Sequence, residues 1–151
     1  MDLNSSNMKI AIACDHAGFS LKAIIIDLAI KAGFEIVDFG TMSNISVDYP
    51  DFVHPLCREI ENASVKMGVL ICGSGNGVAI TANKYSSVRA ALCWNEEIAM
   101  LARKHNNANV LCIPARFVSV KMASQIFKDF ISTPFEGGRH QIRVDKITSG
   151  I

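Results

Sequence analysis

Short apolar runs recur along the chain, separated by segments in which apolar residues return every three or four positions. The runs occupy residues 8–14, 34–39, 67–72, 88–92 and 108–113. Near-continuous apolarity over so few residues is typical of strands that are buried on both faces of a parallel sheet. The pattern therefore predicts five parallel strands.

The intervening segments carry the periodicity of helices. The first runs from Leu21 to a stop at Gly33, and the second, over residues 52–65, is entered through Pro50. Three more helices are expected over residues 76–85, 96–105 and 120–131. Because right-handed crossovers place such helices on both faces of a sheet, the alternation predicts an α/β fold. Its doubly wound, five-stranded parallel sheet would lie in the middle of three α/β/α layers.

The two ends of the chain depart from this alternation. Residues 1–7 are expected to be a disordered extension. Residues 8–151 are expected to form a single domain, since a chain of 151 residues suits one core. A weakly apolar pattern within residues 135–151 predicts a last short helix with no sheet left to cover. Such a helix could pack on another subunit, which favours a dimer.

Composition and charge exclude several classes of protein. Half of the residues are apolar and 19% are charged, so the chain has the material for a buried core. Its formal net charge of +1 is far from the basic excess of a protein that binds nucleic acid or anionic membrane, and neither partner is expected. No secretion-signal core or membrane-spanning run occurs, so a cytoplasmic location is expected. The five cysteines lack a C-x-x-C pair and a zinc-ligand spacing, and are expected to be reduced thiols.

Candidate functional side chains follow three of the predicted strands. Asp15 and His16 follow the first strand, a loop over residues 73–77 follows Cys72 at the end of the third, and Arg116 follows the fifth. Ligands of open parallel sheets bind beyond the carboxyl ends of the strands. These residues are therefore expected to meet at one edge of the sheet.

The loop after Cys72 reads G-S-G-N-G and leads from a strand into a helix. Its glycines allow successive backbone N–H groups to point into one concavity at a positive helix terminus, and such a nest binds negative oxygen. The third glycine of the dinucleotide fingerprint would fall on Val78, and no P-loop motif occurs. NAD and nucleoside triphosphates are therefore not expected as ligands, and a tight turn that serves packing alone is the alternative.

Four further residues are ambiguous from their positions alone. Cys72 could be a base, a nucleophile or a buried strand-end thiol. His105 ends a predicted helix, where a histidine often caps. Arg139 and Arg143 share one helix face, as a solvated surface pair would.

Taken in order, five segments resemble the ribose-5-phosphate isomerase B family, which includes isomerases of galactose 6-phosphate and allose 6-phosphate. They are IACDHAG, VDYPDF, GVLICGSGNGVAITANK, RKHNNANVL and FEGGRHQIR, and the likeness extends along nearly the whole chain. The resemblance implies a Rossmann-like sheet, no cofactor, no required metal and a small-molecule sugar phosphate as substrate. It also implies a homodimer or a dimer of dimers with active sites shared between subunits.

At the reacting end of the sugar, the resemblance implies that Cys72 is the base that moves a proton between C1 and C2. The enediolate oxygen would be held by the loop residues Gly73, Ser74, Gly75 and Gly77, and Asn76 of the same loop would bind substrate. Ser74 stands where many members have threonine, which keeps the hydroxyl. His105, with Asp15 and Tyr49 nearby, would open the sugar ring, and Asn106 would hold sugar hydroxyls.

At the phosphate end, the resemblance implies four binding residues, His16, Arg116, Arg139 and Arg143. The guanidinium groups suit a phosphate dianion because they donate paired hydrogen bonds. Cys72, the glycine nest and the two tail arginines are expected from one chain. His105, Asn106 and Arg116 are expected from its partner.

Aldose isomerisation needs a base, a cradle for negative oxygen and a phosphate anchor, and the chain offers all three. Ribose 5-phosphate is favoured as the substrate. One extra carbon changes discrimination by only ~1–3 kcal/mol, so a six-carbon sugar phosphate stays an alternative. A non-catalytic phosphate-binding module, or a thiol enzyme with Cys72 as nucleophile and His105 as its partner, are alternatives from other classes.

Overall fold

The computed structural model describes residues 8–150, which form one five-stranded sheet with helices on both faces. The strands are β1 (Lys9–Cys14), β2 (Glu35–Asp38), β3 (Met67–Cys72), β4 (Ala90–Leu92) and β5 (Val110–Pro114). All neighbouring strands are parallel, and their order is β2-β1-β3-β5-β4. The expected five-stranded parallel sheet is confirmed. Residues 1–7, expected to be disordered, lie outside the described residues.

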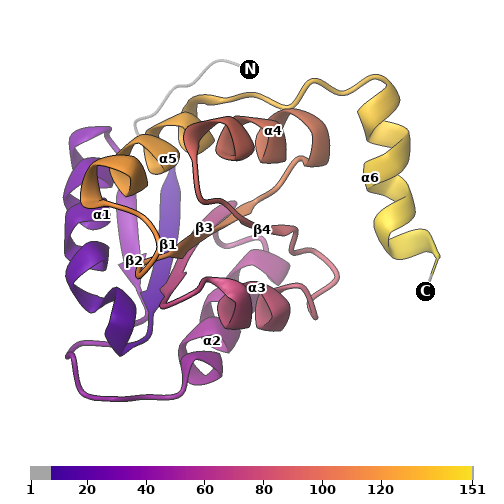
Figure 1. Ribbon diagram of the computed structural model, residues 1–151. Helices are drawn as coiled ribbons and strands as arrows, with labels where there is room; N and C mark the ends of the chain where they lie inside the picture. The colour runs from indigo at the N-terminus through magenta and orange to yellow at the C-terminus, as the bar shows by residue number, and fades with distance from the viewer. Residues whose placement is uncertain (1–7, 151) are drawn as a thin grey trace.

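The described part of the chain forms six α-helices, five of which pack on this sheet (Figure 1). They are α1 (Phe19–Lys31), α2 (Tyr49–Glu61), α3 (Asn76–Ala82), α4 (Glu96–Asn106), α5 (Val120–Ser132) and α6 (Arg139–Ser149), and a short 3₁₀ turn, η2 (His16–Gly18), precedes α1. Helices α1, α4 and α5 cover one face, and α2 and α3 cover the other. This confirms the three α/β/α layers. No helix within residues 8–150 is long and apolar enough to cross a membrane.

The core is divided in two by the sheet because side chains of a strand point alternately to its two faces. Ile12, Val69 and Leu111 belong to the cluster under α1, α4 and α5, which includes the fully buried Phe127. The residues that follow them alternate into the cluster under α2 and α3; they are Ala13, Leu70 and Cys112. Both faces of the three central strands are therefore buried, which explains their near-continuous apolarity.

Two predicted boundaries are wrong at the edge of the sheet. The strand predicted over residues 88–92 begins at Ala90, because Val88 donates its N–H to Tyr85 in a turn. The helix predicted to reach residue 85 ends at Ala82. The side chain of the next residue, Asn83, instead bonds both the N–H and the carbonyl of Ala90, at 2.8 and 2.9 Å.

The boundaries predicted for the second helix, residues 52–65, are also wrong. Helix α2 begins three residues earlier, at Tyr49, and ends at Glu61. Pro50 lies in its first turn, where a residue without an N–H loses no helical hydrogen bond. Beyond Glu61, Ala63 adopts a φ of 59°, which an α-helix cannot continue through.

Helix α6 extends away from the body of the molecule (Figure 1). Two successive glycines with positive φ, Gly137 and Gly138, turn the chain into it, and His140 is its one buried residue. Ile142 and Ile147 are more than half exposed, at 61% and 53%. As expected from the tail, this helix has no sheet to cover.

The tight contact between η2 and β3 generates a prediction about stability. A Cβ on Gly18 would lie 2.7 Å from Ile71 Cγ2 and 2.8 Å from the Ile71 carbonyl oxygen. The backbone must move to admit it, so Gly18→Ala is expected to lower the free energy of unfolding by about 1–3 kcal/mol. Urea unfolding followed by circular dichroism measures the loss.

Gly150→Ala is the control, because a Cβ there would lie at an ordinary contact distance of 3.9 Å from the Lys146 carbonyl oxygen. It is expected to leave the unfolding midpoint unchanged. If the two variants were equally stable, the proposed overlap at Gly18 would be refuted.

Candidate functional site

The carboxyl ends of β1, β3 and β5 are tied together by backbone hydrogen bonds that continue past the strands. The Asp15 N–H donates to the Ile71 carbonyl at 3.1 Å, and the Arg116 N–H donates to the Gly73 carbonyl at 3.0 Å. The three segments are therefore neighbours. Their predicted meeting at one edge of the sheet is confirmed.

Cys72 is the last residue of β3 and is 4% exposed. The backbone N–H of Gly75 donates to its Sγ at 3.2 Å. Gly75 precedes α3 with a φ of 74°, a left-handed conformation that glycine adopts without strain. The loop thus turns an amide directly toward the sulfur and places it beside the start of a helix.

The other four cysteines are weaker candidates for a thiolate. Burial raises the pKa of Cys14 to about 11 and the pKa values of Cys57 and Cys93 to about 12. Desolvation raises the pKa of Cys112 well above its ordinary value, and the neighbouring thiols Cys93, Cys72 and Cys57 add to the shift. These four thiols remain protonated near neutral pH.

Arg116 and Tyr49 lie against two glycines of the nest. A Cβ on Gly73 would be 3.0 Å from Nη1 of Arg116, and one on Gly77 would overlap the Tyr49 ring. Both glycines therefore permit a close approach that a larger residue would prevent. Arg116 is exposed and Tyr49 is 37% exposed, so both remain accessible to a ligand at this edge.

Asp15 and His16 are oriented by backbone groups. Asp15 Oδ1 accepts hydrogen bonds from the N–H groups of Ala17 and Gly18, at 2.9 and 3.3 Å, and so caps η2. The Val47 N–H donates to His16 Nδ1 at 3.2 Å. In neutral His16 the proton is consequently on Nε2, which makes that nitrogen a donor. The sequence did not indicate that Val47 orients His16, because only the backbone N–H of Val47 takes part in this contact.

The segment that carries Val47 is anchored by a buried ion pair. Lys22 Nζ lies 2.7 Å from Asp38 Oδ1 and donates to the Thr41 carbonyl at 2.7 Å. The Lys22 side chain is 4% exposed. A buried cation is tolerated only where it is paired and hydrogen-bonded, so this contact determines where the chain leaves β2. In the loop that follows Cys72, the hydroxyl oxygen of Ser74 accepts a hydrogen bond from the Asn76 N–H at 3.3 Å.

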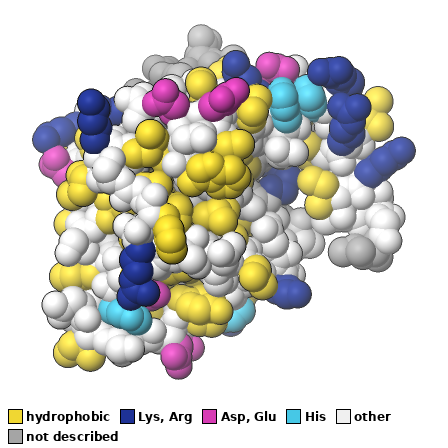
Figure 2. All heavy atoms as spheres, viewed as in Figure 1, with side chains coloured by type: hydrophobic (Ala, Val, Ile, Leu, Met, Phe, Trp, Pro, Cys, Tyr) yellow, Lys and Arg dark blue, Asp and Glu magenta, His cyan; other side chains and the backbone are white. Residues whose placement is uncertain are grey.

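A second group of candidate residues lies where α4 meets α6. His105 and Asn106 end α4, and the His105 ring stacks on His140 with 4.2 Å between centroids and 10° between planes. Figure 2 shows histidine side chains together at this junction, beside Lys and Arg side chains of α6. Desolvation, then the charges of His105 and Arg139, lower the pKa of His140, while Glu136 opposes the shift. His140 lies inside the motif FEGGRHQIR, but its contact with His105 was not predicted, because only the arginines of that motif were considered as candidate residues.

The two groups lie at opposite edges of the sheet within one chain. Asn106 is followed by only three residues before β5 begins at Val110, whereas Cys72 pairs with Pro114, the last residue of β5. Four residue steps along a strand span roughly 13 Å, beyond the reach of a histidine side chain. His105 therefore does not approach Cys72 of its own chain.

This geometry corrects the expected division of residues between two chains. Arg116 lies beside Gly73 of its own chain and hence belongs with Cys72. Arg139 and Arg143 are on α6, whose first turn contacts His105 through His140, and they belong with His105. The sequence-based expectation had grouped Arg139 and Arg143 with Cys72, and Arg116 with His105. A sequence motif identifies a residue but does not show at which edge of the sheet it lies.

No metal was expected, yet three side chains among residues 8–150 bring their ligand atoms together. They are His105, Glu136 and His140, and their nearest ligand atoms all lie within 4.8 Å of one another. The sequence did not indicate this group because its members are separated by up to 35 positions and come from α4, the connecting segment and α6.

Comparisons with known proteins agree about the relatives of this chain. A model of the Ribose/Galactose Isomerase family matches residues 10–147. Ribose-5-phosphate isomerase B of Escherichia coli strain K12 is 40% identical over 141 residues, which cover 93% of this chain and 95% of that protein. The structure of ribose-5-phosphate isomerase B from Clostridium thermocellum superposes with a TM-score of 0.92 at 43% identity, covering 94% of this chain and 96% of that one.

A structure of ribose-5-phosphate isomerase B from Mycoplasma genitalium with bound ribulose 5-phosphate is also similar. It has a TM-score of 0.90 and 44% identity, and the match covers 95% of each chain. Both the sequence and the fold are thus shared with these isomerases over almost their whole length. The chain belongs to the ribose/galactose isomerase family.

Proposed function

We propose that this protein interconverts ribose 5-phosphate and ribulose 5-phosphate by proton transfer through an enediolate. The observation that carries the proposal is the position of Cys72, whose sulfur receives an amide hydrogen bond at the mouth of a glycine nest. The identity to ribose-5-phosphate isomerase B of E. coli and the ribulose 5-phosphate in the Mycoplasma genitalium structure support the choice of substrate.

In the proposed reaction, the Cys72 thiolate removes the proton from C2 of the open-chain aldose. The electron pair of the broken C–H bond forms a C1–C2 double bond, and the carbonyl oxygen on C1 becomes negative. Backbone N–H groups of Gly73 and Gly77 would hold this oxygen, while the Gly75 N–H stays on Cys72 Sγ. Donors placed where negative charge develops lower the energy of the intermediate. Ser74 passes a proton between the two oxygens, and the Cys72 thiol returns its proton to C1 to complete the ketose.

The phosphate end is proposed to bind four cationic or donor groups. His16 offers its Nε2–H because the Val47 N–H occupies the other ring nitrogen, and Arg116 lies at the same edge of the sheet, beside Gly73. Arg139 and Arg143 would come from a second chain. Binding energy at the phosphate holds C1 and C2 against the base, so these residues affect turnover as well as affinity.

His105 and Asn106 of the second chain are proposed to complete the sugar end. His105 would open the ring by taking the proton of the C1 hydroxyl while the ring oxygen gains one. Asn106 and Tyr49 would hold sugar hydroxyls. The hydrogen bonds of the Asp15 carboxylate to other described residues use Oδ1, which leaves Oδ2 to accept one from the substrate.

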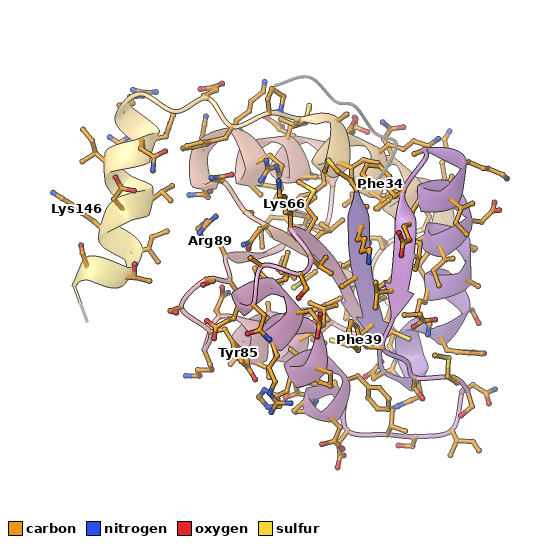
Figure 3. The ribbon with its side chains drawn as sticks, turned by 180° about the vertical axis from the view of Figure 1, so that it is seen from behind. Phe34, Phe39, Lys66, Tyr85, Arg89 and Lys146 are labelled. Atoms are coloured by element: carbon orange, nitrogen blue, oxygen red, sulfur yellow. The ribbon has the colours of Figure 1, made fainter. Side chains whose placement is uncertain are left out.

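A homodimer with two shared sites is part of the proposal. Its support is that Cys72 and His105 are at opposite edges of the sheet, so one chain alone cannot assemble the reaction. A cavity of about 460 Å³ between α6 and the segment before β4, lined by Tyr85, Arg89 and Ile147 among others, offers a surface for the second chain. Figure 3 shows Arg89 between the body and α6. The five unpaired cysteines fit the proposed cytoplasmic location, where thiols stay reduced.

Substrate choice is tested with a panel of aldose phosphates. The purified protein is expected to form ketose fastest from ribose 5-phosphate, with allose 6-phosphate and galactose 6-phosphate slower, as detected by ketose-specific colour development. A six-carbon substrate with the higher kcat/KM would replace ribose 5-phosphate in the proposal. Phosphate binding without any ketose formation would instead indicate a non-catalytic module.

The role of Cys72 is tested by Cys72→Ala, which removes the base but keeps the packing of a small side chain. Turnover is expected to fall by about 10⁴-fold, the top of the range for a general base, while binding of sugar phosphate is kept. Steady-state kinetics and calorimetric binding measure the two effects. Near-normal turnover would refute the assignment.

Cys112→Ala is the matched control, because Cys112 is also a buried thiol on a neighbouring strand and points into the same half of the core. It is expected to retain most of the activity. Intact-mass spectrometry during turnover separates a base from a nucleophile: a covalent adduct on Cys72 would show the thiol-enzyme alternative to be correct.

Sharing of the site between chains is tested by mixing two inactive variants, Cys72→Ala and His105→Ala, after partial unfolding and reassociation. In a mixed dimer one site carries both lesions and the other carries neither. Random pairing makes about half of the dimers mixed, so activity is expected to recover to roughly a quarter of the wild-type value per site. No recovery, with mixed dimers confirmed by native mass spectrometry, would mean that both residues serve one site within one chain.

A further inference from the structure

The cluster of His105, Glu136 and His140 has the composition and spacing of a transition-metal site. His140 Nε2 and Glu136 Oε2 are 3.6 Å apart, and the ligand atoms of all three residues lie within 4.8 Å of one another. In tetrahedral zinc with bonds of 2.0–2.1 Å, neighbouring ligand atoms are roughly 3.3–3.4 Å apart. The His105 and His140 rings are stacked with 10° between their planes, so one ring must turn out of the stack before both nitrogen lone pairs point at one ion.

The backbone that carries these ligands is held in place without a metal. The Glu136 N–H donates to the Lys104 carbonyl at 3.1 Å, which ties the connecting segment to the end of α4. Arg103, one residue earlier on α4, donates from Nε to the Thr133 carbonyl at 3.3 Å. The backbone that carries the ligands is therefore in place before an ion binds, and binding orders side chains alone, including the ring that leaves the stack.

The charges around the cluster select among cations. Glu136 supplies one negative charge, whereas Arg139 and Arg143 both act on His140 as neighbouring positive charges. A hard cation such as Mg²⁺, which binds through oxygen ligands and charge, is disfavoured here. Zinc and similar ions form strong bonds to neutral imidazole nitrogen, so two histidines and one carboxylate suit them.

We propose that His105, Glu136 and His140 bind one zinc ion, or a chemically similar divalent ion, and that the bound ion inhibits the enzyme. A water molecule would occupy the fourth position. The lone pair that His105 gives to the metal can no longer accept a proton from the sugar, so ring opening stops while Cys72 is untouched. The inhibitory effect rests on the proposed role of His105 in isomerisation, whereas the binding does not.

Binding is tested on the full chain with Zn²⁺ alone, by competition with a chromophoric chelator, and with Co²⁺ as a spectroscopic probe. One ion per chain is expected, with the absorption of a tetrahedral cobalt site and no cobalt–thiolate charge-transfer band. Glu136→Gln keeps the shape of the side chain, and His140→Phe keeps an aromatic ring against His105. Each is expected to lower the affinity at least roughly 10-fold, since even the loss of an outer-shell partner has such an effect.

Two controls separate this cluster from other ligands. Cys72→Ala and His54→Asn, the second a histidine of α2 that bonds Tyr85 instead, are expected to keep the full affinity. Failure to bind one ion per chain would refute the site. Binding that survives in both Glu136→Gln and His140→Phe but is lost in Cys72→Ala would refute it as well.

Inhibition is tested by measuring isomerisation with and without Zn²⁺. The wild-type enzyme is expected to be inhibited and to recover with EDTA, and Glu136→Gln and His140→Phe are expected to be active and resistant. Stoichiometric zinc without inhibition, or equal inhibition of both variants, would refute the inhibitory role. Absence of isomerisation in the metal-free protein would instead count against the proposed function, and the binding arm would still decide the metal site.

Discussion

The hydrogen-bond ladder of β1, β3 and β5 does not stop where the strands stop, and the reacting end of the proposed site depends on this extension. Bonds from Asp15 to Ile71 and from Arg116 to Gly73 hold three loop segments at fixed separations. An amide that stabilises developing charge is effective when it is already oriented, because no reorganisation is then needed during the reaction. The sheet therefore supplies preorganisation as well as a core.

The same extension explains why part of the site was predictable from the sequence. Apolar runs identified the five strands, and the rule that ligands bind beyond strand ends brought Cys72, His16 and Arg116 to one edge. The start of the strand at Ala90 was harder to predict, because it depends on hydrogen bonds from the Asn83 side chain to this edge strand. The pattern of apolar residues reflects burial, and the three residues of this edge strand are only partly buried.

The second half of the site could not be predicted in this way. The stacking of His105 on His140 brings the end of α4 against the start of α6. The connection before α6 contains two glycines with positive φ, and the pattern of apolar residues does not predict the direction in which such a connection turns the chain. Family resemblance named Arg116 as a functional residue but associated it with the wrong edge. Its backbone bond to Gly73 was needed to place it, because a motif carries no information about distance.

Helix α6 carries Arg139 and Arg143 outside both hydrophobic clusters, and this has a consequence for how the family can diverge. Exposed residues away from a core usually change stability by less than ~0.5 kcal/mol when substituted. In the proposed dimer, mutations on α6 would therefore be selected mainly through ligand contacts and association of chains, while mutations near Cys72 would also affect folding. If its two arginines bind phosphate as proposed, this helix could adapt to a longer or shorter sugar phosphate without any change in the sheet that carries Cys72.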